Sequence, residues 1–307
     1  MSATAIKRSI LLVLVFAASA VAACASAGTP GPSTPGSPSS SPGSSVPSVV
    51  AETSYLADIV QNVAGGRMKV ESLLPLGTDP HSFDPTPRDA AKVAKARAIV
   101  INSPGFEPPV DRLMAGAAGE DLAIIDAANG LAGKNVDPHF WLDPIDVITY
   151  VENIRAGLTA IDPEGADEYA GNAAAYEQQL RALDFWITGR VAAIPASRRL
   201  LVTNHESFGH FAERYGFKVV GTVFPTAGGE GAPSAKALGT LIDDIRATGA
   251  PAIFLETGSN PDLADQVARE TRVKIVTDLY THSLAENAPT YLEMMRWNVD
   301  RIVEALR

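Results

Sequence analysis

Three histidines and one aspartate in this chain have the residue types and the spacing of a metal site. His81, His139, His205 and Asp278 are separated by 58, 66 and 73 residues, and each stands where a strand is expected to end or a turn to begin. Imidazole nitrogens and carboxylate oxygens are common metal ligands, and the chain has only five histidines in all. Four such side chains, contributed by four distant loops, predict one metal centre that the fold assembles.

Short local sequences fix the backbone just before each of these residues. His81 and His139 both end the tripeptide Asp-Pro-His, in which proline restricts its own backbone and that of the residue before it. His205 follows the run Leu-Leu-Val-Thr-Asn, and Asp278 follows Val-Lys-Ile-Val-Thr, and both runs are typical of strands. Capping a helix or lying satisfied in a core would explain any one of the four residues, but not the set.

The donor atoms of this set indicate which metal it suits. Three neutral imidazoles and one carboxylate fit Zn²⁺ in tetrahedral geometry, whereas Mn²⁺, Ca²⁺ and Mg²⁺ prefer more oxygen ligands. The same site would accept Ni²⁺, Co²⁺ or Cu²⁺, and a bidentate Asp278 would accommodate Mn²⁺. Four protein ligands leave no open position for a nucleophilic water, so the sequence predicts a protein that carries zinc rather than an enzyme that uses it.

Other polar residues near these positions have less defined roles. Glu256 ends an apolar strand, where its carboxylate could accept the free ring N–H of a ligand histidine; a helix-capping or solvated role is the alternative. His282 lies four residues after Asp278 and is a reserve ligand. His210 and Glu206 are expected to point away from the metal.

The N-terminal region predicts export and a lipid anchor. Residues 1–23 carry Lys7 and Arg8 before an apolar run that suits a secretory signal and is too short to span a membrane. The signal ends in Val-Ala-Ala-Cys24, which resembles the lipobox of bacterial lipoproteins and implies lipidation of Cys24, the chain's one cysteine. Residues 24–46 form a Ser/Pro/Gly tether. We expect the protein to be anchored to the outer face of the cell membrane.

The charge of the chain excludes some partners. The formal net charge is −10 at pH 7, and loss of Lys7 and Arg8 with the signal leaves 23 basic against 35 acidic residues, a net charge of −12. Such a surface repels nucleic acid and mildly concentrates cations. A monomer that binds a metal ion, and no nucleic acid, is expected.

The pattern of strands and helices after the tether predicts an α/β fold with two lobes, each a parallel sheet flanked by helices. The first lobe is expected over residues 47–162, a linking helix over 163–194 and the second lobe over 195–307. From Pro163 to Val191, apolar or large residues recur every three or four positions without an internal proline, which predicts one long backbone helix that joins the lobes. Expected strands include residues 98–101, 122–125, 199–203, 219–223, 252–255 and 273–276.

Three segments that contain the histidines carry a family resemblance. They read GTDPHSFDPTP over residues 77–87, DPHFWLDP over 137–144 and NHESFGHF over 204–211. Together they resemble the zinc- and manganese-binding solute-binding lipoproteins of bacterial metal ABC importers, and the likeness covers nearly all of residues 47–307. It implies two lobes joined by one long helix, a metal in the cleft between them and an ABC permease as partner.

The resemblance also assigns the ligands by motif position. It implies His81 and His139 as the first two ligands, His205 at a third position that some members fill with glutamate, and Asp278 as the fourth. Many zinc-binding members have a histidine-rich loop before the second ligand, which is absent between residues 115 and 135 here. Manganese, or iron, therefore stays open as an alternative to zinc.

Other classes of protein fit the sequence less well. A secreted zinc hydrolase would use a helical His-Glu-x-x-His pair, which does not occur in this chain. A siderophore-binding protein of similar architecture would need an aromatic or arginine-lined cleft. A lipid-anchored adhesin or sensor with the same metal site and no transport role is the remaining alternative.

Overall fold

The structure, a computed structural model, describes residues 47–117, 121–133, 137–224, 233–257 and 260–307. The described residues belong to one compact unit. The predicted signal segment, the tether and Cys24 lie outside the described residues. Across the described ranges, no helix is both long enough and apolar enough to cross a membrane.

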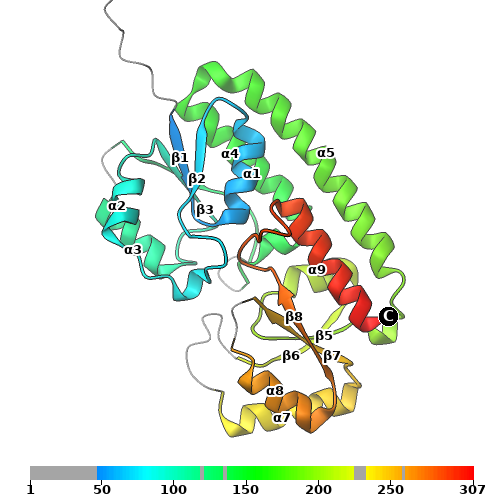
Figure 1. Ribbon diagram of the computed structural model, residues 1–307. Helices are drawn as coiled ribbons and strands as arrows, with labels where there is room; N and C mark the ends of the chain where they lie inside the picture. The colour runs from blue at the N-terminus through cyan, green and yellow to red at the C-terminus, as the bar shows by residue number, and fades with distance from the viewer. Residues whose placement is uncertain (1–46, 118–120, 134–136, 225–232, 258–259) are drawn as a thin grey trace, which may run out of the picture. The chain divides into compact units, whose positions relative to one another are not determined.

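Two parallel four-stranded sheets form the two lobes, as the sequence predicts. The first lobe has the order β2-β1-β3-β4 and the second has β6-β5-β7-β8 (Figure 1). All pairings between these strands are parallel. The strands are β1 Ser48–Ala51, β2 Lys69–Ser72, β3 Ala98–Ile101, β4 Ala123–Asp126, β5 Leu200–Thr203, β6 Lys218–Thr222, β7 Ala252–Glu256 and β8 Lys274–Leu279.

Helices pack around both sheets, and their ends follow local sequence signals. Thr86 and Asp89 form a reciprocal capping box at the start of α2, with Pro87 in its first turn. Short 3₁₀ turns at Pro80–Ser82 and Phe140–Leu142 hold the chain at His81 and just after His139. The helices are α1 Ser54–Ala64, α2 Pro87–Val93, α3 Pro108–Ala117, α4 Asp146–Ile161, α5 Ala166–Val191, α6 Gly209–Tyr215, α7 Ala235–Thr248, α8 Asp262–Thr271 and α9 Tyr291–Leu306.

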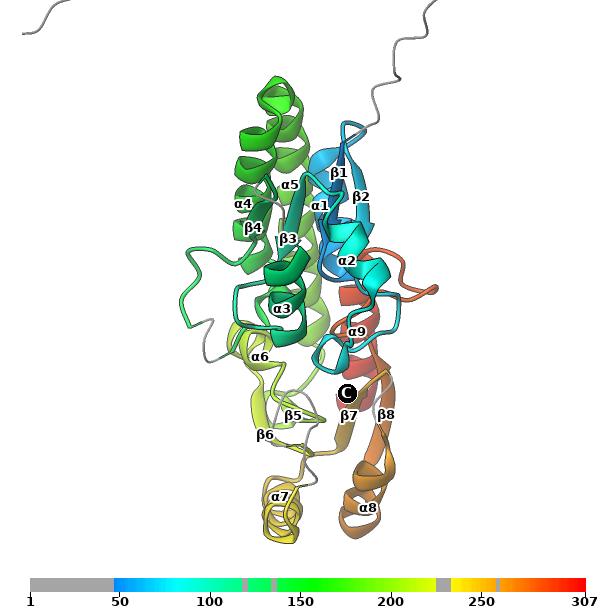
Figure 2. The same ribbon diagram turned by 90° about the vertical axis from the view of Figure 1, so that its left-hand side faces the viewer.

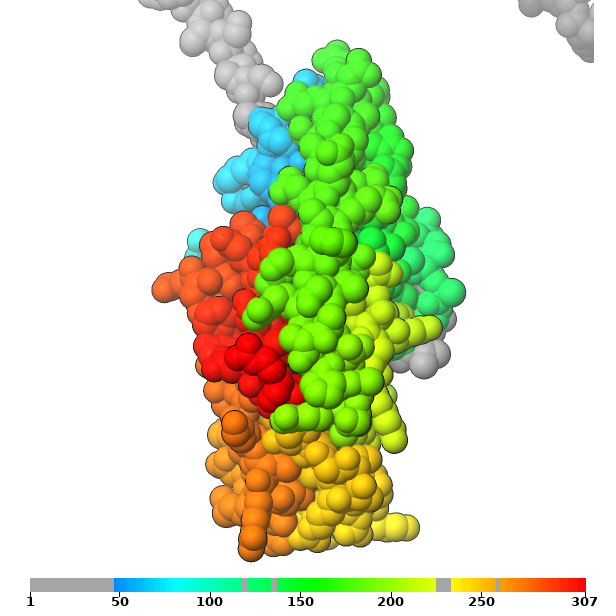
Figure 3. Space-filling view, turned by 90° about the vertical axis from the view of Figure 1, so that its right-hand side faces the viewer, coloured from blue at the N-terminus to red at the C-terminus, as the bar shows by residue number. Residues whose placement is uncertain are grey.

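The long helix expected from Pro163 to Val191 is present as α5, preceded by a 3₁₀ turn at Pro163–Gly165. It runs alongside both lobes (Figure 1). The chain's last helix, α9, leaves the second lobe and packs against α5 and α1; Figure 3 shows its surface beside that of α5. The buried face of α5 is the predicted set, Tyr169, Ala173, Tyr176, Leu180, Leu183, Ile187 and Val191.

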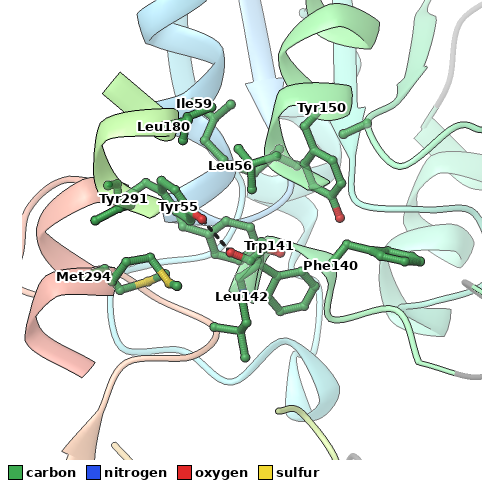
Figure 4. Close-up of a cluster of buried hydrophobic side chains, with 14 of the residues drawn as sticks. Tyr55, Leu56, Ile59, Phe140, Trp141, Leu142, Tyr150, Leu180, Tyr291 and Met294 are labelled. Carbon is green, nitrogen blue, oxygen red and sulfur yellow. Dashed lines mark hydrogen bonds between the residues drawn. The ribbon is translucent and has the colours of Figure 1, made fainter. Parts of the chain in front are cut away.

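One hydrophobic core runs through both lobes, and its centre lies next to the candidate site. It joins residues of both sheets with the buried faces of α1, α4, α5 and α9, while two smaller clusters lie beneath the outer helices. Trp141 is fully buried at its centre, stacked on Tyr55 with ring centroids 4.7 Å apart. The Tyr291 hydroxyl donates to the carbonyl oxygen of Trp141 over 2.7 Å (Figure 4). This core therefore fixes the backbone two residues after His139.

Candidate metal centre

Four histidine side chains converge between the two lobes. One ring nitrogen each from His81, His139, His205 and His282 lies within 4.8 Å of the other three. Their segments follow β2, β4, β5 and β8, respectively, so each is delivered beyond the carboxyl end of a parallel strand, where such sheets bind ligands. The side chains of His81, His139 and His205 are 7%, 2% and 3% exposed, and that of His282 is 6% exposed. Two histidines come from each lobe.

Among the described residues the fourth member of this group is His282, whereas Asp278, the fourth ligand predicted from the sequence, is not in the group. The strand does not end at Val276, because β8 continues to Leu279 with an irregular register against β7. Asp278 lies within this extension, exposed and with a φ of 71°. The loop that enters the site therefore begins later than the sequence pattern indicated, and it presents His282.

A carboxylate faces the Nδ1 atom of every one of these histidines. His139 Nδ1 lies 2.8 Å from Asp137 Oδ1, and His81 Nδ1 lies 3.1 Å from Glu107 Oε1. Glu256 serves two rings, with Oε1 3.1 Å from Nδ1 of His205 and Oε2 3.0 Å from Nδ1 of His282. An Nδ1–H that points at a carboxylate leaves Nε2 as the free lone pair, which is the tautomer that a metal ligand needs.

The Nε2 atoms behave as unfilled acceptors. Those of His81 and His282 are buried, and among the described residues neither has a hydrogen-bond partner. Nε2 of His139 and of His205 lie 3.4 Å apart. Metal–nitrogen bonds of about 2.0–2.1 Å in a tetrahedron place two nitrogens about 3.3–3.4 Å apart. This pair already has that spacing, within a group whose ring nitrogens all lie within 4.8 Å of one another.

Burial keeps the rings of His139 and His282 neutral. It lowers the pKa of His139 to about 3, despite the opposing hydrogen bond from Asp137. Burial also lowers the pKa of His282, and Glu256 only partly offsets this effect. Because metals bind the unprotonated ring, these two rings are in the form that could bind a metal at neutral pH.

His81 and Glu256 show the opposite balance between burial and charge. Burial acts against protonation of His81, but its hydrogen bond and attraction to Glu107 outweigh it, so the pKa of His81 is raised. Burial would raise the pKa of Glu256, yet attraction to His282 and His205 holds that pKa well below its usual range. The centre therefore carries negative charge behind the histidines, and the ring of His81 holds a proton more readily than those of His139 and His282.

The repeated Asp-Pro-His sequence has a local explanation. Asp79 Oδ1 accepts a hydrogen bond from the backbone N–H of His81 over 3.0 Å, and Asp137 Oδ1 accepts from that of His139 over 3.1 Å. Both are aspartate turns that fix the histidine two residues later. Only Asp137 also contacts the ring, because the first histidine takes its carboxylate from Glu107 instead.

The carboxylates that contact the histidines differ in how easily the sequence reveals them. Asp137 could have been found, since it belongs to the repeated tripeptide. Glu107, buried to 1% exposure, stands near no motif. Glu256, at the end of β7, contacts Nδ1 of His205 and of His282, and Ser207 Oγ donates to its Oε1 over 3.1 Å. Glu206 is exposed.

Contacts between the lobes surround the His282 loop. Trp141 Nε1 donates to the carbonyl oxygen of Thr281 over 2.5 Å, next to His282. On its other side, Ser283 Oγ accepts a hydrogen bond from the N–H of Gly77 over 2.7 Å. A cleft of about 690 Å³ opens beside this loop and reaches His205 as well, so the second lobe's two histidines line the opening to solvent.

Comparisons with known proteins agree with this architecture. A profile of the family described as "Zinc-uptake complex component A periplasmic" matches residues 49–305. The manganese-binding lipoprotein MntA of Halalkalibacterium halodurans is 34% identical over 84% of this chain and 88% of its own length. The iron-binding protein YfeA of Yersinia pestis is 33% identical, over 83% of this chain and 85% of that protein.

Solved structures with this fold have been determined with metals. A manganese-bound periplasmic metal-binding protein from Candidatus Liberibacter asiaticus superposes with a TM-score of 0.77 at 29% identity, over 85% of this chain and all of that one. The periplasmic zinc-binding protein TroA of Treponema pallidum gives a TM-score of 0.77 at 26% identity, over 85% of this chain and 99% of that one.

Proposed function

The chain belongs to the zinc-uptake component A family, as the resemblance read from its sequence predicts, and from that premise we propose that it captures Zn²⁺ outside the cytoplasm and delivers it to an ABC permease. Proteins of this family work as substrate-binding components of metal importers. The ligands we propose are the Nε2 atoms of His81, His139, His205 and His282.

The observation that supports zinc as the bound metal is the all-imidazole donor set. Within the described residues, the group contains four ring nitrogens and no carboxylate oxygen. Four neutral nitrogens suit tetrahedral Zn²⁺, whereas Mn²⁺ favours oxygen ligands and higher coordination. The carboxylates of Glu107, Asp137 and Glu256 contact the Nδ1 atoms of the rings rather than the metal. There they orient the rings and compensate the charge of the ion.

The proposed cycle is capture by closure and release by opening. Two ligands from each lobe must come together to complete the coordination, so a bound metal favours the closed arrangement of the lobes. A partner that stabilises a more open arrangement lowers the affinity and lets the metal leave. Four protein ligands leave no position for a reacting water, which suits transport rather than hydrolysis.

Manganese is the second candidate, since relatives such as MntA are named for it. Elemental analysis of the purified protein, followed by competition of Zn²⁺ against Mn²⁺, decides between them. We expect one zinc per chain and a preference for zinc of at least a thousandfold. A preference for manganese would overturn the zinc assignment, and no bound transition metal at all would overturn the proposed function.

We also propose that Cys24 carries a lipid anchor. Support comes from the lipobox-like sequence before it and from relatives that are named lipoproteins, among them MntA. The wild-type protein should fractionate with membranes and the Cys24→Ala variant should not, with zinc binding the same in both. A wild-type protein that is wholly released, with Cys24 unmodified, would contradict this proposal.

A further inference from the structure

His210 contacts the chain on both sides of the second ligand, from across the cleft. It lies on α6 in the second lobe, and its Nε2 donates to the carbonyl oxygen of Asp137 in the first lobe over 2.9 Å. Its ring also stacks on Phe140, with centroids 4.2 Å apart and an interplanar angle of 30°. His139 therefore lies between two residues that His210 touches. Figure 2 shows α6 at this junction of the lobes.

The start of α6 also lies close to the side chain of Asp137. Asp137 Oδ2 is 3.8 Å from His210 Nε2. A Cβ atom at Gly209 would lie only 2.2 Å from the same Oδ2, so only glycine allows this approach without a shift. Because Asp137 Oδ1 accepts a hydrogen bond from the ring of His139, a shift of α6 would move Asp137 and, through it, the ring of His139.

The short segment 205–210 links three parts of the site. It carries the ligand His205, it carries Ser207, which holds Glu256, and it carries His210. The two ligands that this segment connects, His205 and His139, are the pair already at the spacing of a tetrahedral site, 3.4 Å between Nε2 atoms. In contrast, the whole group spreads to 4.8 Å.

We propose that His210 is a positioning residue that clamps the His139 loop of the first lobe onto the His205 segment of the second, and so sets how long the metal stays bound. The proposal rests on the proposed function, because it concerns the same site. His210 is not a ligand: its Nε2 is used by a carbonyl oxygen, and its Nδ1 lies 3.9 Å from Asp146 Oδ2 on the side away from the centre.

The clamp should act on dissociation more than on association. A metal can leave only when His139 and His205 separate, and separation breaks the His210–Asp137 hydrogen bond. Association of the ion with the open site does not require that bond. One hydrogen bond contributes roughly 0.5–1.5 kcal/mol, which corresponds to about a two- to thirteenfold change in rate.

The test measures metal release from the full-length protein. Zinc-loaded protein is mixed with excess chelator, and the rate of zinc transfer is followed for wild type, His210→Ala, His210→Gln, Gly209→Ala and the control Glu213→Ala, an exposed residue of the same helix. We expect His210→Ala to release zinc about three- to tenfold faster and Gly209→Ala to release it faster too. His210→Gln should be slower than His210→Ala, since its amide can donate to Asp137. Glu213→Ala should match wild type.

A spectroscopic readout separates positioning from ligation. With Co²⁺ in place of zinc, the ligand-field absorption should be the same in wild type and both His210 variants, and a changed band would make His210 a ligand and overturn the proposal. Release from His210→Ala at the wild-type rate, or equal acceleration by Glu213→Ala, would also overturn it. If His210→Ala does not fold, His210→Gln and Gly209→Ala still decide by the same rates. Failure of wild type to bind zinc or Co²⁺ identifies failure of the proposed function instead.

Discussion

His282 and Asp278 stand four residues apart and face different surroundings. The ring of His282 is buried with its Nδ1 on Glu256, whereas the side chain of Asp278 is exposed and its carbonyl oxygen accepts from Trp297 Nε1 over 2.7 Å. His282→Ala should therefore lower zinc affinity at least tenfold, about 1.4 kcal/mol, and the matched Asp278→Ala variant should leave it within about twofold. Competition with a zinc indicator measures both. Equal losses in the two variants would contradict the four-histidine site.

Glu256 differs from the other carboxylates because it holds two rings. Replacement by glutamine keeps one acceptor oxygen, but the amide N–H₂ then faces an Nδ1–H and repels it. We expect Glu256→Gln to weaken zinc binding by about 10- to 100-fold. Glu107→Gln, which affects His81 alone, should cost less. Chelator titration of both variants provides the measurement, and a larger loss for Glu107→Gln would argue against the shared role of Glu256.

Glu52 is a buried acid that the metal does not use. It is 1% exposed, its Oε2 accepts from the N–H of Asn102 over 2.7 Å, and burial raises its pKa to about 8 from a usual value of 4.5. The folded protein thus keeps this proton more tightly than the unfolded chain. As a result, the free energy of unfolding should fall as pH rises from about 4.5 to about 8.

The Glu52→Gln variant should remove this pH dependence, because its amide oxygen still accepts from Asn102 and never ionises. Relative to wild type, we expect little change near pH 4.5 and a gain of roughly 2–4 kcal/mol at pH 8 and above. Denaturant unfolding of the metal-free protein at several pH values gives the comparison. A gain that is constant with pH would show that Glu52 does not titrate in this window.

At the scale of elements, Trp141 connects the loop after one ligand to the loop before another. Its indole donates to Thr281, and its carbonyl oxygen accepts from Tyr291 at the start of α9 (Figure 4). Trp141→Phe keeps an aromatic ring against Tyr55 but leaves the Thr281 carbonyl unpaired in the core. We expect a loss of about 1–3 kcal/mol in stability and weaker zinc binding through His282.

Thermal unfolding and zinc titration of Trp141→Phe test both effects. Leu56→Val is a useful comparison, since Leu56 is buried in the same core and its side chain offers no hydrogen bond. Loss of stability with unchanged zinc affinity in Trp141→Phe would mean that the Thr281–His282 loop holds its position without the indole.

The sequence predicted the elements better than the ends of the elements. Apolar runs and caps located α2, α5 and the strands, because these signals are local. The end of β8 is not determined by the local sequence, because it depends on the pairing of β8 with β7. This pairing extends to Leu279 through an irregular register. Because of that extension, the fourth ligand that we propose is His282 rather than Asp278.

The outer carboxylates illustrate a second limit of sequence reading. Asp137 and Glu256 follow from position, the first in a motif and the second at a strand end. Glu107 lies 26 residues from His81, and only the packing of the α3 region against the 3₁₀ turn at Pro80–Ser82 brings them together. Contacts of this kind depend on the tertiary arrangement of lobes and loops, which no periodicity encodes.

At the scale of the whole molecule, metal binding should stabilise the fold with little change in size. The ligand nitrogens already lie within 4.8 Å, and α5 runs alongside both lobes without a break. A hundredfold excess of zinc over its dissociation constant should add about 2.7 kcal/mol of stability. Melting curves at increasing zinc test this, and solution scattering should show closely similar radii of gyration with and without metal. A change of several ångströms would indicate wide hinge closure.

The return of α9 to the first lobe restricts how this chain can be divided. Its buried face, which includes Tyr291, Met294 and Val299, packs into the same core as α1 and α5. A fragment that stops after β8 would lack α9 and would leave the apolar surface of α1 and α5 that α9 covers open to water. A second-lobe fragment expressed alone would carry α9 without α1 and α5. Two separately expressed halves should therefore be poorly soluble alone and recover when mixed. For the same reason, a protease that cuts just before Tyr291 would loosen the first lobe, because the start of α9 is held there by the Asp58 carboxylate, which accepts from the N–H of Tyr291 over 2.9 Å.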